Sequence, residues 1–178
     1  MADQIERALR RVEAQLVGRV SLPGGNGYTA ATAIWPKPVG PMPRAVVHCR
    51  TTEDVQLSIA IARDCGLPLS VRGGGHDWAG RALCAGVVID LSGMNGVSVD
   101  ADHRSAIISG GARAVDVAAV TDPLHVAAAT GACSAVGMTG LTLGGGYGPL
   151  IGRFGLALDN LVAAEVVLAD GHLSLIHI

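Results

Sequence analysis

The sequence has 178 residues, which is enough for one domain that buries roughly two-thirds of the surface its unfolded chain exposes. Apolar residues make up 49% of the chain and aromatic residues only 3%, so the core is expected to consist of Ala, Val, Leu and Ile. Thirteen basic and fifteen acidic residues give a net charge of -2 with no basic cluster. This charge pattern excludes a nucleic-acid groove and a basic membrane-binding helix as default functions.

The N-terminal 44 residues predict a helix followed by an extended segment. Apolar side chains recur at helical spacing at Ile5, Leu9, Val12 and Leu16, and Gly18 marks the end of this helix. An amphipathic helix of this kind is not an export signal, so we expect a cytoplasmic protein with reduced cysteines. Residues 19–44 are rich in Gly and Pro and are predicted to contain no regular element.

The rest of the chain predicts a mixture of strands and helices. In chain order they are a strand at 45–48, a helix from Thr51 or Thr52 to about Asp64, strands at 68–72, 86–91, 97–99 and 105–109, a helix at 114–120 and a strand at 161–168. The first helix and the strands on either side of it form one β-α-β unit. The three strands that follow this unit are expected to make an antiparallel half.

Residues 126–152 carry no charged side chain and are long enough to span a bilayer. The run contains eight glycines and a proline, which do not suit a membrane helix. We therefore expect no membrane partner.

The last six residues, Leu-Ser-Leu-Ile-His-Ile at 173–178, differ in character from what precedes them. The end sequence of a common transposon-based sequencing library encodes this hexapeptide. We therefore divide the chain into an N-terminal helix and extended segment at 1–42, a domain at 43–172 and a probable adapter-derived tail at 173–178. The alternative is a genuine edge strand.

Glycine accounts for 25 residues, about twice the usual share of ~7%, and it is clustered. Three successive glycines, Gly73 to Gly75, allow backbone N–H groups to converge on an anion such as a pyrophosphate. This cluster lacks the lysine of a P-loop, and the Gly110-Gly111-Ala112 turn lacks the third glycine of a dinucleotide fingerprint. The second cluster, at 131–148, suits close backbone approach to a flat or extended ligand.

Four strings resemble, in order and spacing, the FAD-binding half of the vanillyl-alcohol-oxidase superfamily, with the berberine-bridge-enzyme-like oxidases as the most similar branch. They are R-G-G-G-H-D-W-A-G (72–80), V-V-I-D-L-S-G-M-N (87–95), G-A-C-S-A-V-G-M-T-G-L-T-L-G-G-G-Y-G (131–148) and R-F-G-L-A-L-D-N (153–160). The resemblance covers about residues 43–171. It implies an α+β fold, a PCMH-type FAD-binding domain of two α+β subdomains, truncated before the substrate domain.

The resemblance also implies that FAD is the cofactor and that His76 is bonded to the flavin 8α-methyl, with Cys133 as a second attachment at C6. A neutral imidazole is nucleophilic at neutral pH, whereas a thiol must first be partly ionised. Against the second bond, Ser134 and Ala135 replace the branch's usual Pro-Thr, and Leu141 replaces a common histidine. The full set of expected cofactor-binding residues is Arg72, Gly73, Gly74, Gly75, His76, Asp77, Cys133, Val136, Gly137, Gly140, Leu141, Gly144, Gly145 and Tyr147.

The implied function is transfer of a hydride from a small organic substrate to covalently bound flavin and then to oxygen, as the small Val136 favours. The substrate class stays open among sugars, alkaloids, alcohols and amines, because the family carries its catalytic base in a following domain. Alternatives are a noncovalent FAD dehydrogenase of the same superfamily and an inactive cofactor-binding fragment. Three residues, Arg72, Asp77 and Asp159, are each either a cofactor contact or a local structural partner. Isolated histidines (His48, His103 and His125) and the absence of G-x-S-x-G argue against a metal site and a hydrolytic triad.

Overall fold

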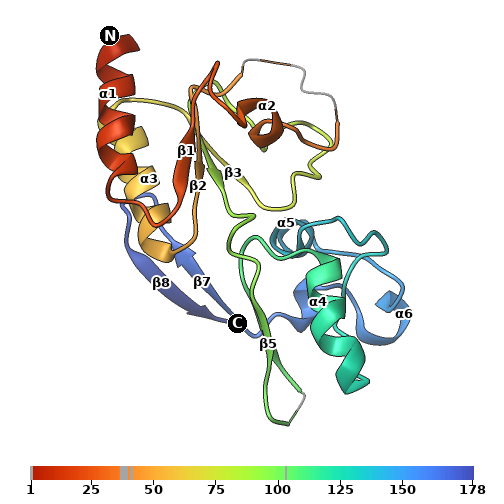
Figure 1. Cartoon of the computed structure of the whole chain (residues 1–178). Coiled ribbons are helices and arrows are strands. Elements are labelled where there is room, and N and C mark those ends of the chain that lie inside the picture. The colour runs from red at the N-terminus through yellow and green to blue at the C-terminus, as the bar shows by residue number, and fades with distance from the viewer. Residues whose placement is uncertain (1, 37–39, 41, 103) are drawn as a thin grey trace.

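The computed structural model describes residues 2–36, 40, 42–102 and 104–178. The elements form two groups, a larger one around a four-stranded sheet, to which the C-terminal strands return, and a smaller one around α4 and α5 (Figure 1). The helices of three or more residues and the strands are α1 (Ala2–Glu13), β1 (Arg19–Ser21), α2 (Tyr28–Ala31), β2 (Ala45–His48), α3 (Thr52–Asp64), β3 (Leu69–Arg72), β4 (Val87–Asp90), β5 (Val97–Val99), β6 (Ala106–Ile108), α4 (Ala114–Thr121), η1 (Asp122–Leu124), α5 (Met138–Leu143), α6 (Ile151–Phe154), η2 (Leu158–Asn160), β7 (Ala163–Val167) and β8 (Leu173–His177). The predicted α+β fold is confirmed.

The main sheet has the strand order β1-β2-β4-β3. β4 lies between β2 and β3 and is parallel to both, whereas β1 is antiparallel to β2. The expectation that β4 opens an antiparallel half is therefore wrong; only β5 and β6 pair that way there. The chain from β3 to β4 returns to the starting edge of the sheet, so the two strands run in the same direction.

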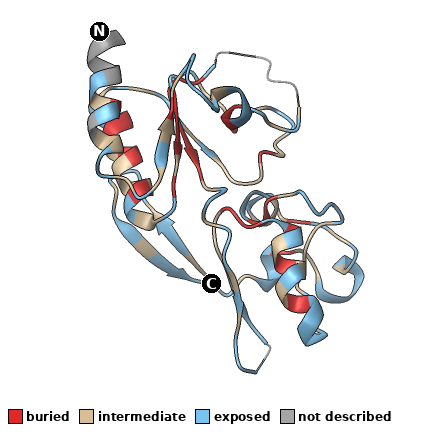
Figure 2. Cartoon of the chain, viewed as in Figure 1, coloured by how far each residue is buried: buried red, intermediate tan, exposed pale blue. Residues whose placement is uncertain are grey.

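Successive side chains of each strand point to opposite faces of the sheet, and both faces of this sheet are buried. Ala45, Val47, Val87 and Ile89 point to one side, where they pack against α1 and α3. Val46 and Val88 point to the other side, where they pack with Ala31 of α2. The continuous apolar runs of β2 and β4 thus follow from burial on both faces, as in other parallel sheets (Figure 2).

The N-terminal segment is more regular than its composition predicts. β1 and α2 fall within residues 19–44, for which no regular element was expected. β1 exists because its three residues pair with β2, from Arg19 opposite His48 to Ser21 opposite Val46. α2 starts after Gly27 in the left-handed region, and the Tyr28 hydroxyl donates to the Pro43 carbonyl. Both elements depend on tertiary partners, which the local sequence does not reveal.

The smaller part has its own core of Ala114, Val117 and Met138, with Val97 and Ile108 packed against it. The predicted strand at 97–99 and the helix beginning at 114 are confirmed. In the described part of the chain no helix is long and apolar enough to cross a membrane. The uncharged run at 126–152 instead forms loops and the short helices α5 and α6.

The C-terminal strands β7 and β8 form an antiparallel hairpin beside α3 (Figure 1). The Gln56 side-chain amide donates to the Gly171 carbonyl at the hairpin turn, and Val167 packs on the main core. β8 occupies five of the six residues interpreted as an adapter-derived tail. Pairing with β7 is what these residues do in this chain, and their origin stays a prediction.

Candidate functional site

The two glycine clusters, 56 or more residues apart in the sequence, meet backbone to backbone. A methyl group on Gly74 would lie 2.7 Å from the Gly137 Cα and closer still to its nitrogen. A methyl group on Gly137 would lie 2.9 Å from the Gly74 Cα. Only residues without a Cβ permit this approach, so the glycines serve a contact between the two loops as well as any ligand.

Hydrogen bonds tie the second loop to the start of α4. Ala114 N–H donates to the Val136 carbonyl and Met138 N–H donates to the Ala112 carbonyl, at 3.0 and 2.9 Å. Arg113 and Gly137 form an isolated antiparallel bridge between these two bonds. The position of Gly137 is therefore set by the core of the smaller part, and the contact with Gly74 transmits that position to the main sheet.

This contact brings the two candidate attachment residues together. The Cys133 Sγ lies 4.0 Å from the His76 Nε2, and Cys133 is exposed. The structure therefore places a thiol and an imidazole at one exposed site, as the paired-attachment hypothesis requires. Their role in binding a cofactor stays a prediction.

Arg72 lies at the end of β3, immediately before the glycines. Its Nη1 donates to the Ala31 carbonyl at 3.1 Å and lies 3.5 Å from the Asp90 carboxylate, so it is a structural partner. Its buried Nε has no hydrogen-bond partner among the described residues. A hollow of about 160 Å³ opens beside it, lined by Arg72, Gly73, Gly74, Ser92, Asn95, Gly111, Arg113 and Asp116. The Arg72 guanidinium and the backbone of Gly73 and Gly74 at this hollow suit an anionic group.

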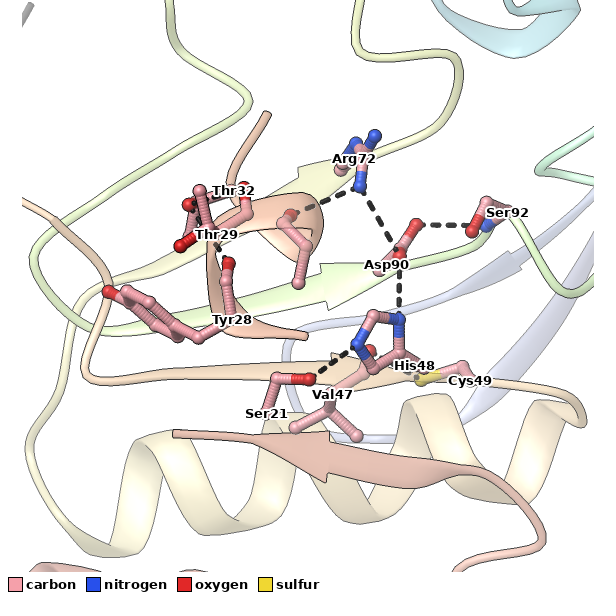
Figure 3. A network of polar contacts seen from close by, with 11 residues as sticks. Ser21, Tyr28, Thr29, Thr32, Val47, His48, Cys49, Arg72, Asp90 and Ser92 are labelled. Carbon is pink, nitrogen blue, oxygen red and sulfur yellow. Dashed lines mark hydrogen bonds and ion pairs between the residues drawn. The ribbon is translucent and has the colours of Figure 1, made fainter. Parts of the chain in front are cut away.

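A row of three polar residues crosses the sheet at this edge. His48, Asp90 and Arg72 are the last residues of β2, β4 and β3, and the parallel register sets them side by side (Figure 3). The His48 Nδ1 lies 2.9 Å from the Asp90 carboxylate. The expectation that His48 is isolated from any carboxylate is therefore wrong. The contact could have been predicted from the two strand sequences A-V-V-H and V-V-I-D, because parallel pairing of these strands brings their polar last residues together.

Burial raises the pKa of Asp90, but hydrogen bonds from His48 and Ser92 and the nearby Arg72 charge outweigh it, so the pKa lies below the ordinary value. On its other side the His48 Nε2 lies 2.9 Å from the Ser21 hydroxyl. Ser21, His48 and Asp90 thus have the connectivity of a hydrolytic triad. Ser21 is only 3% exposed, so no substrate reaches it, and the chain of hydrogen bonds is structural.

The second loop continues through α5 into a tight turn. Val136 is half-buried, and no atom lies within 4 Å of a methyl group placed on Gly140. The Leu141 side chain lies against Gly131 and Gly146, where a Cβ would be too close to it, and Gly144 ends the helix α5. Gly145 has a φ of +93°, and its carbonyl accepts from Leu158 N–H. Tyr147 is 79% exposed. These candidates all lie on the same loop.

The remaining candidates have local partners. Asp77 accepts hydrogen bonds from the backbone N–H groups of Ala79 and Arg81, and Asp159 accepts one from Leu156 N–H. Both carboxylates therefore fix turns, the structural alternative for these residues. His103 lies outside the described residues. Within the described ranges, no group of three His, Cys, Asp or Glu side chains is arranged to hold a metal ion.

Trp35 is a site residue that the sequence did not identify. Its ring stacks on the His76 imidazole with the centroids 5.0 Å apart and the planes at 25°. Its position among the prolines of the N-terminal segment gives no local indication of this contact.

Comparison with known proteins relates this arrangement to flavoproteins. A family model described as an FAD binding domain matches residues 43–175. The (R)-6-hydroxynicotine oxidase of Paenarthrobacter nicotinovorans is 37% identical over 155 residues, which are 86% of this chain and 34% of that protein. The chain spans about a third of the length of the curated relatives it matches.

Two solved structures have the same fold. BBE-like 1 of Physcomitrella patens superposes with a TM-score of 0.89 at 28% identity, over 97% of this chain and 37% of that one. Glucooligosaccharide oxidase of Acremonium strictum superposes with a TM-score of 0.87 at 30% identity, over 97% and 36%. The latter structure is described with a 6-S-cysteinyl, 8α-N1-histidyl FAD.

Proposed function

The chain belongs to the FAD-binding domain family of the vanillyl-alcohol-oxidase superfamily, and on this premise we propose that it is the FAD-binding portion of an FAD-linked oxidase. The observation that carries the proposal is the meeting of the two glycine loops, with the His76 Nε2 and the Cys133 Sγ 4.0 Å apart. A flat ring attached at two points requires two nucleophiles on facing loops. This chain supplies an imidazole and a thiol there.

The residues present fit FAD at both ends of the site. The Arg72 guanidinium and the backbone of Gly73 and Gly74 suit the pyrophosphate, which would lie in the hollow that these residues line. At the other end, Gly140 has open space where a side chain would extend, which leaves room for a ring system along α5. His76 would hold the flavin covalently at the 8α-methyl and Cys133 at C6.

When bound, FAD supplies the redox chemistry by accepting a hydride from a substrate carbon and passing the electrons to oxygen. The chain's own contribution is to bind and orient the cofactor. The Asp90 carboxylate holds Arg72 in place, and the contact between Gly74 and Gly137 holds the two attachment residues at a constant separation. Val136, a small side chain on the second loop, leaves space for oxygen.

The decisive experiment is acid precipitation of the protein translated from the full gene and loaded with FAD. Flavin is expected to stay with the pellet, and peptide mapping is expected to find its mass on the peptides containing His76 and Cys133. His76→Ala and Cys133→Ala should each retain flavin through the other residue, and the double variant should release all of it. Release of all flavin from the unmodified protein would support the noncovalent dehydrogenase instead. Release of all flavin from His76→Ala alone, with the protein folded, would mean that Cys133 is an ordinary thiol with no bond to the flavin.

The 178-residue chain by itself is proposed to bind the cofactor without turnover, because the catalytic base is expected outside it. An FAD site between domains leaves apolar surface when one domain is absent, and exposed Leu143, Tyr147 and Phe154 lie in the second loop or just after it here. We therefore expect the isolated chain to associate or to bind FAD weakly. A monodisperse, strongly yellow preparation would contradict this. The four free cysteines favour a reducing compartment, as in the cytoplasm.

A further inference from the structure

The segment that precedes the family match contacts the first glycine loop at several points. The match begins at residue 43, yet Trp35 N–H donates to the Gly75 carbonyl at 2.8 Å. The Ala31 carbonyl accepts from Arg72, and Ile34 Cγ2 lies 3.6 Å from the place of a Gly75 Cβ. Residues 31–35 therefore hold the loop at its beginning and near its end.

Stacking adds a contact to the reactive side chain itself. The Trp35 ring lies on the His76 imidazole, and Trp78 stacks on Trp35 with the centroids 5.6 Å apart at 19°. These are the two tryptophans of an aromatic-poor chain, and they are 62% and 77% exposed. Burial in a core therefore does not account for their placement. Offset-stacked aromatic rings attract each other beyond the area they cover, which keeps the imidazole in one orientation.

The loop that carries His76 needs such a constraint. Three glycines precede the histidine, and Gly75 has a φ of +68°. Glycine has the largest backbone freedom of any residue, so His76 would otherwise sample many orientations. Attachment would join the His76 nitrogen to the exocyclic 8α-methyl carbon, with loss of the N–H and one methyl C–H, and the flavin would take up the two electrons and pass them to oxygen. Forming this bond requires the two atoms in a narrow range of geometries.

We infer that residues 31–35 are a clamp on the first glycine loop, and that Trp35 is the positioning residue that orients His76 for attachment to the flavin. The role of Trp35 in orienting His76 for attachment rests on the proposed function, whereas the contact between Trp35 and His76 does not. Trp35 acts through His76 and does not take part in the bond. The clamp places part of the site in a segment outside the family match.

The contact is tested without flavin by carbethoxylation of histidines in the 178-residue chain, read residue by residue by mass spectrometry. His125 is exposed and serves as the reference, and His48 reports unfolding because both of its ring nitrogens are hydrogen-bonded. Trp35→Leu, which fills space without a flat ring, should raise His76 labelling relative to His125 about two- to tenfold, the range an aromatic pair contributes. Trp35→Phe should stay near the unmodified chain. An unchanged ratio in Trp35→Leu, with His48 still protected, would overturn the clamp.

The positioning role is tested in the FAD-loaded protein by the acid-stable share of bound flavin. Trp35→Leu should lower the rate of attachment about two- to tenfold while total FAD binding changes less than twofold, and Trp35→Phe should restore the rate. Trp78→Phe is the matched control, since the Trp78 ring stacks on Trp35. Equal rates in Trp35→Leu and the unmodified protein would refute the role. If the unmodified protein holds no acid-stable flavin, the proposed attachment fails, and the labelling ratio still decides the contact.

Discussion

Replacing Gly74 with alanine tests the contact between the two loops directly. The added methyl group must move from 2.7 Å to at least 3.4 Å from the Gly137 Cα, and further from its nitrogen. Both neighbours are backbone atoms, so no side chain can rotate away, and the loops themselves must separate. Overpacking of this kind lowers the free energy of unfolding by about 1–3 kcal/mol, and the rigid surroundings place Gly74→Ala near the upper end of this range.

Gly140, three residues after Gly137 in the second cluster, provides a matched control. A methyl group on Gly140 meets no atom within 4 Å, and the residue lies inside α5. Gly140→Ala should therefore be neutral or stabilise the chain by up to about 1 kcal/mol through helix propensity. Urea unfolding without FAD, followed by circular dichroism, should separate the two variants by about 2–4 kcal/mol. A difference below about 0.5 kcal/mol, the usual range for neutral surface changes, would refute the contact.

Three further outcomes are expected. Asp90→Asn should lower the free energy of unfolding by about 3 kcal/mol at pH 7, because it breaks a buried charge pair. The pKa of Asp90 is lowered in the folded chain, so the stabilisation by the carboxylate is present above the unfolded pKa and is lost as the pH falls through the folded pKa. The urea midpoints of the variant and the unmodified chain should therefore converge below about pH 4. Iodoacetamide at pH 8 should label exposed Cys133 well before Cys49, because burial raises the pKa of the Cys49 thiol to about 11, and equal rates in the folded chain would contradict the structure. Sequencing the gene itself beyond the codon for His172 should give residues other than Leu-Ser-Leu-Ile-His-Ile, and the same hexapeptide in genomic DNA would establish a native edge strand.

Elements with local signals were predictable from the sequence. The helix at 52–64 begins as expected, with the Thr51 hydroxyl accepting from Asp54 N–H, and the strand at 97–99 has the predicted bounds. The glycine clusters were recognisable because their composition is unusual whatever they contact. In each case the information lies within a few residues of the element it determines.

Features that depend on distant partners were not predictable in the same way. β1 has three residues and exists through pairing with β2, so composition alone indicated an irregular segment. Trp35 reaches His76 across 41 positions, and proline-rich surroundings gave no reason to expect it there. The parallel placement of β4 between β2 and β3 depends on the path of a loop rather than on strand composition.

The row His48, Asp90 and Arg72 explains how an apolar sheet supports a polar site at its edge. Each of the three residues is the last of its strand, and the residues before it are apolar or neutral. The three strands therefore change from apolar core to polar site at the same level of the sheet. One carboxylate lies between an imidazole and a guanidinium, which keeps Asp90 ionised and holds Arg72 through its Nη1. Among the described residues, the buried Arg72 Nε has no hydrogen-bond partner. An asparagine at position 90 would neutralise none of the guanidinium charge, so the ionised Asp90 is what allows Arg72 to lie half-buried next to the glycine loop.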